Sequence, residues 1–338
     1  MACLARYLGG FHLAVFIDGQ LESSAGCTSN TARRTLPRLG STELLSERDS
    51  EFSGSRILLI TASAAHPTET SAKLPSLNWT HSFLVVTLHA LGLLALWFWP
   101  RPIDLVLFFS LYLATTFSIG IGYHRLLTHR GFVSPRWLRR ILAWTGAAAL
   151  QGGPARWVAI HRRHHQMADK HGDPHSPLRG FLHAHVGWIM RRDAAEGSDY
   201  RTLVPDVSGN DPWLRILDYK ILFTLPWVLT ALLCYGIGGW RGVLWGAVVR
   251  TLTLWHLTWC INSVCHVIGK RPNQTRDESR NVWWLGLLTL GEGWHNNHHA
   301  HPRSAVHGWR WYQVDISGYA IRLMAQVGLI GKVLREPR

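Results

Sequence analysis

The stretch Gly291-Glu292-Gly293-Trp294-His295-Asn296-Asn297-His298-His299 places three histidines within five residues. Positions i, i+3 and i+4 lie on one face of a helix, so this spacing can aim three imidazoles at one point. A second segment with the same spacing lies upstream, His161-Arg162-Arg163-His164-His165. Because neutral imidazole is a good ligand for iron, zinc and copper, we expect the two segments to form two walls of a metal site.

A third histidine segment has a different spacing. His124 and His129 are five residues apart, and they would lie about 140° apart on a helix with 3.6 residues per turn. They could not reach one ion from a regular helix, unless they serve two ions or the helix ends between them. With His266, the set offers up to nine imidazoles, and one ion would leave several of them idle. The histidine set therefore favours two metal ions.

Four apolar runs are each close to the roughly 20 residues that a helix needs to cross a bilayer. They are Ser82–Trp99, Ile103–Gly122, Ile221–Ile237 and Val243–Ile261. Short breaks at residues 100–102 and 238–242 separate the members of each pair. We therefore predict an all-α integral membrane protein with four transmembrane helices in two hairpins. Arg250 and His256 lie within the last run, and we expect them to face the protein interior because ionisable groups are costly in lipid.

The remaining segments are predicted to lie on one side of the membrane. An even number of crossings leaves the N-terminus, residues 123–219 and residues 267–338 on the same side. The middle section is rich in arginine, whereas the two breaks carry one arginine each, Arg101 and Arg241. The positive-inside rule places that side in the cytoplasm. All nine histidines would then lie at the cytoplasmic face. Residues 137–150 read as an amphipathic helix, either in the membrane interface or in the core.

Composition is consistent with this arrangement. The chain has 338 residues, 47% of them hydrophobic, and its 18 tryptophans are concentrated beside the apolar runs, as in interfacial belts. The formal charge of +14 could reflect nucleic acid or an anionic membrane surface, but no nucleic-acid-binding motif is present, so no nucleic-acid partner is expected. Residues 21–80 are rich in Ser, Thr, Arg and Glu, and we predict that residues 1–78 form a mostly disordered extension preceding one domain at 79–338.

The ligand chemistry narrows the reaction. Zinc hydrolases usually combine histidine with a catalytic carboxylate, and no Asp or Glu lies inside the three segments. A nitrogen-rich site for two ions beside apolar helices fits oxygen activation on iron, with hydrogen removed from a lipid chain. A lipid hydroxylase or ketolase would use similar chemistry. A membrane metal carrier is disfavoured, because its ligands would be spread along a path through the spans.

From about Trp79 to Leu334 the chain resembles the membrane fatty acid desaturases of the acyl-CoA (stearoyl, delta-9) type. The resemblance rests on residues 122–129, 157–165, 172–177, 262–266 and 291–299, which contain the histidine segments and their flanks. The sequence His307-Gly308-Trp309-Arg310-Trp311-Tyr312-Gln313-Val314-Asp315 is most similar to the bacterial and plant-type branch.

This resemblance implies a cytosolic helical cap that holds a histidine-rich di-iron site, with two Fe²⁺ ions as cofactors and O₂ as co-substrate. The implied metal ligands are His124, His129, His161, His164, His165, His266, His295, His298 and His299, with Asn262 reaching one iron through a water. No catalytic side chain is expected beyond these ligands. The implied reaction is desaturation of a saturated acyl chain, usually at position 9, on coenzyme A or on a lipid. No fused cytochrome b5 domain is recognisable, so a separate donor of the ferredoxin or cytochrome b5 type is expected to supply electrons.

Overall fold

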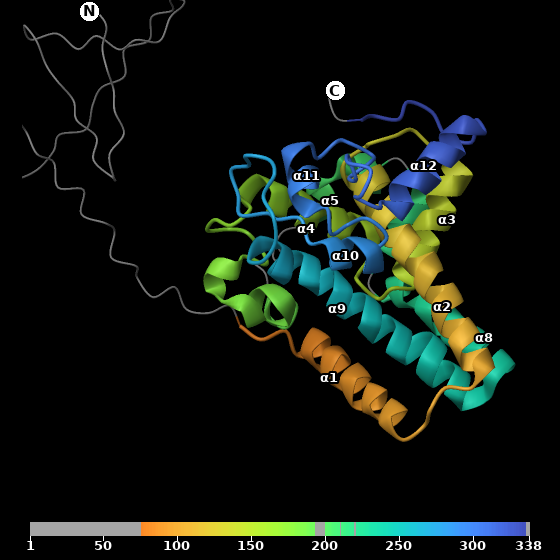
Figure 1. Ribbon diagram of the computed structural model, residues 1–338. Helices are drawn as coiled ribbons and strands as arrows, with labels where there is room; N and C mark the ends of the chain where they lie inside the picture. Colours follow the sequence, from red (N-terminus) through yellow and green to blue (C-terminus); the bar gives the residue numbers. More distant parts are fainter. Residues whose placement is uncertain (1–75, 193–199, 210, 220, 336–338) are drawn as a thin grey trace, which may run out of the picture. The chain divides into compact units, whose positions relative to one another are not determined.

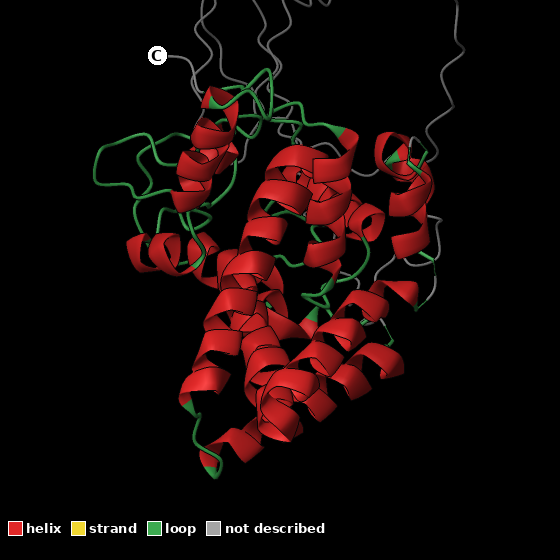
Figure 2. Cartoon of the chain, turned by 90° about the vertical axis from the view of Figure 1, so that its right-hand side faces the viewer, coloured by secondary structure: helices red, strands yellow, loops and turns green. Residues whose placement is uncertain are grey.

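The computed structural model describes residues 76–192, 200–209, 211–219 and 221–335. This part of the chain is helical, and isolated β-bridges such as Val133–Gly331 are its only extended pairings (Figure 2). Residues 1–75, which make up most of the predicted extension, lie outside the described residues. Asn78 caps the first helix, because its side chain accepts a hydrogen bond from the His81 backbone N–H at 3.2 Å.

The first part of the chain supplies two long apolar helices and two helices that carry or support histidines. These are α1 (Trp79–Leu93) with η1 (Leu94–Leu96), α2 (Pro102–Phe117) with η2 (Ser118–Thr128), α3 (Arg136–Ala147) and α4 (Pro154–Met167). Short segments follow: η3 (Pro177–Arg179), η4 (His183–Gly187), α5 (Tyr200–Leu203), α6 (Pro205–Ser208) and α7 (Pro212–Leu217). Of these, α5, α6 and α7 pack against α4, and η4 packs against α9.

A second long apolar section follows and leads into the last histidine segment. Its helices are η6 (Leu222–Thr224), α8 (Leu225–Gly242), η7 (Val243–Val249), α9 (Arg250–Ser263) and η8 (Val264–His266). The C-terminal part contains α10 (Trp283–Leu288), α11 (His295–Ala300) and α12 (Ile316–Gln326). Figure 1 shows α4, α10, α11 and α12 gathered above the long helices α1, α2, α8 and α9.

Three helices of the described chain are long and apolar enough to cross a membrane: Trp79–Leu96, Pro102–Thr128 and Leu222–His266. The third has 45 residues and folds back on itself. Gly239 has φ 62° and ψ −158°, which is not helical. A Cβ placed on Gly246 would lie 2.7 Å from the Cys234 sulfur, although twelve residues of straight helix would separate them by about 18 Å. The two predicted runs are therefore two arms of a bent helical segment.

The two turns between the apolar helices pack against each other. The Arg101 guanidinium donates to the Gly238 carbonyl at 2.5 Å and to the Asp104 carboxylate, which also caps the start of α2. The rings of Phe98 and Trp240 meet edge to face with centroids 4.7 Å apart. The turns at residues 98–102 and 238–242 consequently lie at the same end of the helices.

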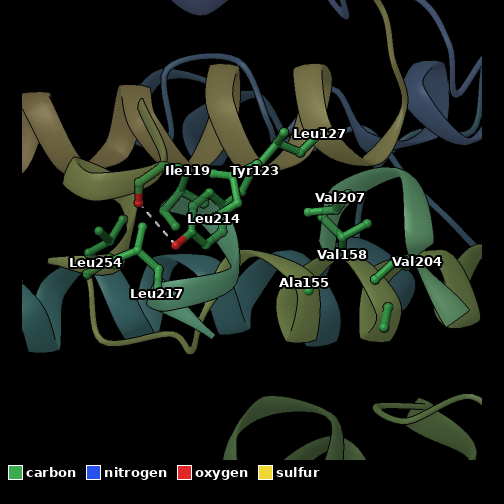
Figure 3. Close-up of a cluster of buried hydrophobic side chains, with 14 residues drawn as sticks. Ile119, Tyr123, Leu127, Ala155, Val158, Val204, Val207, Leu214, Leu217 and Leu254 are labelled. Atoms are coloured by element: carbon green, nitrogen blue, oxygen red, sulfur yellow. Dashed lines mark hydrogen bonds between the residues drawn. The ribbon is translucent and has the colours of Figure 1, made fainter. Parts of the chain in front are cut away.

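A buried apolar cluster fixes the first histidine segment against the second. Figure 3 shows Ile119 and Tyr123 of η2 beside Leu214 of α7, in the same buried cluster as Leu127 of η2 and Val158 of α4. The Tyr123 hydroxyl donates to the Ala143 carbonyl of α3 at 3.3 Å. Because η2 precedes His129 and α4 contains His161, this core sets the distance between the two segments.

Candidate metal centre

The structure gathers all nine predicted histidines into two groups of ring nitrogens. In each group, the candidate ligand atoms lie within 4.8 Å of one another. The five-histidine group consists of His124, His129, His161, His165 and His298. The four-histidine group consists of His164, His266, His295 and His299. The groups adjoin, since the rings of His165 and His299 stack with centroids 4.4 Å apart.

The first segment reaches a single group through an unusual helix. We expected His124 and His129 to diverge on a regular helix, but η2 is a π-helix, and the His129 N–H donates to the His124 carbonyl at 3.1 Å. Bonds between residues five apart bring positions i and i+5 onto one face. The two ring centroids are 4.9 Å apart. The predicted divergence applied only to a regular helix with 3.6 residues per turn, and η2 does not have that geometry.

The other two segments each serve both groups. In α4, His161 and His165 join the five-histidine group, whereas His164 joins the four-histidine group. In α11, His298 joins the former, and His295 and His299 join the latter. The expectation that each segment aims all three rings at one point was therefore wrong. Neighbouring residues on an α-helix differ by about 100°, so α4 and α11 each present imidazoles to two adjacent positions.

Facing ring nitrogens mark the centre of each group. The Nε2 atom of His298 lies 2.8 Å from Nε2 of His165 and 3.0 Å from Nε2 of His124. In the other group, Nε2 of His266 lies 3.1 Å from Nε2 of His295. A neutral imidazole has one N–H donor and one nitrogen with a lone pair. Where several Nε2 atoms face one another, their lone pairs can be donated to a bound cation.

Four carboxylates hold histidines from behind. Nδ1 of His124 is 2.5 Å from Glu292, and Nδ1 of His164 is 3.0 Å from Asp173. Nδ1 of His266 is 2.8 Å from Asp169, and Nδ1 of His299 is 2.9 Å from Asp277. Carboxylates in this position fix the ring orientation and make the opposite nitrogen a better ligand. Asp169, Asp173 and Glu292 flank the segments in sequence, whereas the role of Asp277 was not predicted.

A buried arginine connects the first segment to the C-terminal part of the chain. Arg125 donates to Glu292 at 2.9 and 3.0 Å, to Asp315 at 2.9 and 3.0 Å and to the Ala305 carbonyl at 3.0 Å. These contacts use all five guanidinium donors. Burial favours a protonated Glu292, but the charge of Arg125 outweighs burial and lowers the Glu292 pKa well below its usual range. Glu292 therefore stays ionised beside His124.

Six of the grouped histidines, all outside the three candidate membrane helices, are held neutral. Burial is the largest cause that lowers their pKa values well below 6.5, and the neighbouring imidazoles add to it. The six residues are His129, His161, His165, His295, His298 and His299. A neutral imidazole is the form that binds metal. The buried Nε2 atoms of His129, His164 and His299 have no hydrogen-bond partner among the described residues. The nitrogen-rich donor set therefore fits two divalent transition-metal ions such as iron.

Two further histidines lie at the centre although the segment spacing did not reveal them. His307 follows the last histidine segment by eight residues, and it is 1% exposed with its ring centroid 4.6 Å from that of His298. Its Nδ1 atom is 3.7 Å from Glu292. His175 packs on His164 with centroids 4.3 Å apart. Neither residue follows helical spacing from a segment, so only the tertiary fold identifies them.

A cavity of about 800 Å³ adjoins the five-histidine group. His161 and Asn262 both line it, and so does Trp157, whose ring stacks on His161 with centroids 4.9 Å apart. Most of its other wall residues are apolar or aromatic, among them Leu84, Val85, Leu150, Ile160, Trp255 and Trp259. Asn262 thus lies beside the centre on α9, and its predicted link to an ion through water stays a prediction.

Comparison with known proteins gives a consistent assignment. The profile described as "Fatty acid desaturase" matches residues 102–316. The chain is 40% identical over 266 residues to a Nostoc protein named sn-2 palmitoyl-lipid 9-desaturase, covering 78% of this chain and 92% of that protein. It is 37% identical to a Synechocystis protein named sn-1 stearoyl-lipid 9-desaturase, covering 81% and 85%.

Plant relatives are similar to the same part of the chain. An Arabidopsis thaliana protein named Delta-9 desaturase-like 5 is 45% identical over 65% of this chain and 73% of that protein. The family profile spans all three histidine segments. Together these segments carry eight of the nine grouped histidines. The chain therefore belongs to the fatty acid desaturase family.

Proposed function

We propose that this protein inserts a double bond into a saturated fatty acyl chain by using O₂ and two iron ions held by the nine grouped histidines. Fatty acid desaturation follows from family membership. The observation that carries the metal assignment is the meeting of two buried histidine groups beside a cavity with apolar walls. The alternative, a lipid hydroxylase or ketolase, would use the same ligands. The relatives reported above, however, are named as desaturases.

The proposed reaction needs an external donor of two electrons, because the removal of two hydrogens supplies only half of the electrons that reduce O₂ to two waters. One –CH₂–CH₂– unit, O₂, two electrons and two protons give one –CH=CH– unit and two waters. When bound, the iron ions would supply the oxygen reduction and the oxidising power needed to remove two hydrogens from an unactivated chain. The protein's own task is to hold the chosen carbons near the centre and to exclude bulk water.

Aromatic side chains and one polar relay shape the cavity for that task. The Trp157 indole donates to Gln151 at 3.2 Å, and the Gln151 amide donates to Thr258 at 2.9 Å. All three residues line the cavity, and this relay joins α4 to α9. It therefore holds the Trp157 ring against His161. Burial of the chain contributes about 0.8 kcal/mol for each methylene, which favours a long acyl substrate.

We place the double bond at position 9, by analogy with the relatives named as 9-desaturases. Other relatives are named for position 7 of a palmitoyl galactolipid or position 5 of a C20 acyl-CoA, so the position differs among relatives. The carrier is proposed to bear phosphate, because Arg156, Arg163 and Arg192 all contribute to the cavity wall. Coenzyme A and phospholipids share that chemistry.

The proposed membrane arrangement has four crossings, with the bent segment Leu222–His266 supplying two of them. The turns at residues 98–102 and 238–242 would lie at the outer face and the histidine end at the cytoplasmic face. This orientation is supported by the arginine-rich composition of the histidine end. Electrons would come from a separate ferredoxin or cytochrome b5 type of carrier, and the basic surface would attract an acidic one.

Expression in a host without its own desaturase tests the proposal. Fatty acid profiling should reveal a monounsaturated product, and cleavage at the double bond should place it at carbon 9. Supplying labelled acyl-CoA or labelled phospholipid to membranes would separate the two carriers. A hydroxylated product, or the absence of any new product despite two bound iron ions, would refute the proposal.

A further inference from the structure

We propose that the four-histidine group binds its metal ion more tightly than the five-histidine group, because Asp169, Asp173 and Asp277 stand behind it. This inference rests on the proposed function, in which the grouped histidines are ligands. The number of ligands alone would predict the opposite order, since the five-histidine group has one more imidazole.

Each of the three aspartates orients one histidine of the four-histidine group. Asp173 contacts His164, Asp169 contacts His266 and Asp277 contacts His299, at distances of 2.8 to 3.0 Å. In each pair the carboxylate meets Nδ1, which leaves Nε2 to point away from it. Three of the four rings in this group are thus fixed with the same nitrogen available to an ion.

Backbone N–H groups hold these aspartates in place before any ion binds. Asp173 accepts hydrogen bonds from the N–H groups of Asp169 and His175 at 3.0 and 3.2 Å. Asp169 accepts one from Glu278 at 2.7 Å, and Asp277 accepts one from Ser279 at 3.0 Å. The carboxylates therefore need little rearrangement to orient the histidines.

The five-histidine group has weaker support. Within the described residues, Glu292 is the one carboxylate that hydrogen-bonds to a member of this group, His124. Its charge is shared with Arg125, which also pairs with Asp315. The three aspartates behind the other group pair instead with histidines. The four-histidine position therefore has more uncompensated negative charge nearby.

Two physical effects then act in the same direction. A carboxylate behind an imidazole raises the basicity of the ligating nitrogen, and its loss typically costs 10–100-fold in metal affinity. Negative charge in a buried, water-poor site also attracts a divalent cation more strongly than it would in solvent. With three such carboxylates against one, the four-histidine position should fill first and release its ion last.

Metal titration of the full-length, metal-free protein in detergent tests this order. Co²⁺ is the probe, added without oxygen and followed by visible absorption, with a chelator competing for the ion. We expect two binding steps with affinities at least tenfold apart. His295→Ala should remove the tight step and His129→Ala the weak step, because each residue belongs to one group only.

The carboxylates supply the matched pair of variants. Asp277→Asn keeps the size of the side chain but removes its charge, and it should weaken the tight step by about 10–100-fold. Glu292→Gln should weaken the weak step instead. If His295→Ala does not fold, as judged by helix content, the comparison of Asp277→Asn with Glu292→Gln decides the order.

Several outcomes would overturn the inference: equal affinities in the unaltered protein, loss of the tight step in His129→Ala, or an unchanged tight step in Asp277→Asn. A protein that binds two ions and desaturates a fatty acid, but fills the five-histidine position first, would refute this inference alone. A protein that binds no ion, or makes no unsaturated product when loaded with iron, would refute the proposed function.

Discussion

The histidine end and the turn end of the long helices are held together in different ways. At the histidine end, Arg125 is completely buried and its five donors are matched by two carboxylates and a carbonyl. At the turn end, the side chain of Arg101 is 43% exposed and donates to the Gly238 carbonyl, and an irregular glycine and an aromatic pair complete the contact. The difference suggests that the histidine end depends on matched charges, whereas the turn end depends on backbone conformation and packing.

Removal of one shared imidazole should have the largest effect. His298 contacts both His124 and His165, so His298→Ala should lower bound iron and abolish the unsaturated product. His301→Ala is the matched control, because His301 follows the same helix but packs on Trp309, outside both groups. Iron analysis and fatty acid profiles would check this. Full activity in His298→Ala would contradict the site assignment.

Acidification should weaken the histidine end next. The pKa values of His161, His165, His295 and His299 are lowered in the fold, so below pH 6.5 the unfolded chain takes up protons that the folded chain does not. Stability is therefore lost as pH falls below 6.5, by about 1.4 kcal/mol per pH unit for each such histidine. Protons also compete with the ions. Iron content and the thermal unfolding temperature should both be lower at pH 5 than at pH 7. Unchanged iron content at pH 5 would argue against neutral, buried ligands.

Loss of the buried arginine charge should be somewhat less severe. Arg125→Met leaves Glu292 and Asp315 buried without their cation, which costs about 3–5 kcal/mol when one partner of a buried pair is removed. Arg101→Met at the turn end should cost less, because the Arg101 side chain is 43% exposed, although its partner Asp104 is buried. Thermal unfolding and iron content of both variants would measure the contrast. Equal losses would remove the distinction between the two ends.

A change at the turn end should have the smallest effect. The backbone at Gly239 adopts a conformation that is essentially restricted to glycine, so Gly239→Ala should cost on the order of 1–3 kcal/mol. Gly236→Ala is the matched control, since neither glycine has an atom within 4 Å of an added Cβ and Gly236 lies within the helix. Iron content should remain unchanged in both. Loss of iron in Gly239→Ala would show that the two ends are coupled.

Much of the site was predictable because it depends on local spacing. Histidines at i, i+3 and i+4 mark the faces of α4 and α11, and apolar runs mark the long helices. These patterns predicted which imidazoles would meet, including His266 from the end of the fourth apolar run. They could not predict how α4 and α11 divide their rings between two positions, because that depends on the angle at which the helices pack.

The parts that were missed depend on contacts between distant residues. The π-helical geometry of η2 is not marked by a residue pattern, and it accompanies the packing of Tyr123 against α3. His307 and Asp277 lie in loops without periodicity. Asp315 pairs with Arg125 across nearly two hundred residues. A single sequence has no signal for such pairings, since many acidic residues could in principle serve.

The contact of Arg125 with Asp315 has a consequence for biogenesis. A ribosome releases Asp315 only after all the apolar helices have been made, and synthesis proceeds from the N-terminus. Until then Arg125 lacks one of its two carboxylates, and α11 has only just emerged. The histidine end can therefore be completed only after the long apolar helices have been synthesised. A nascent chain stalled before residue 315 should occupy the bilayer while remaining unable to retain iron.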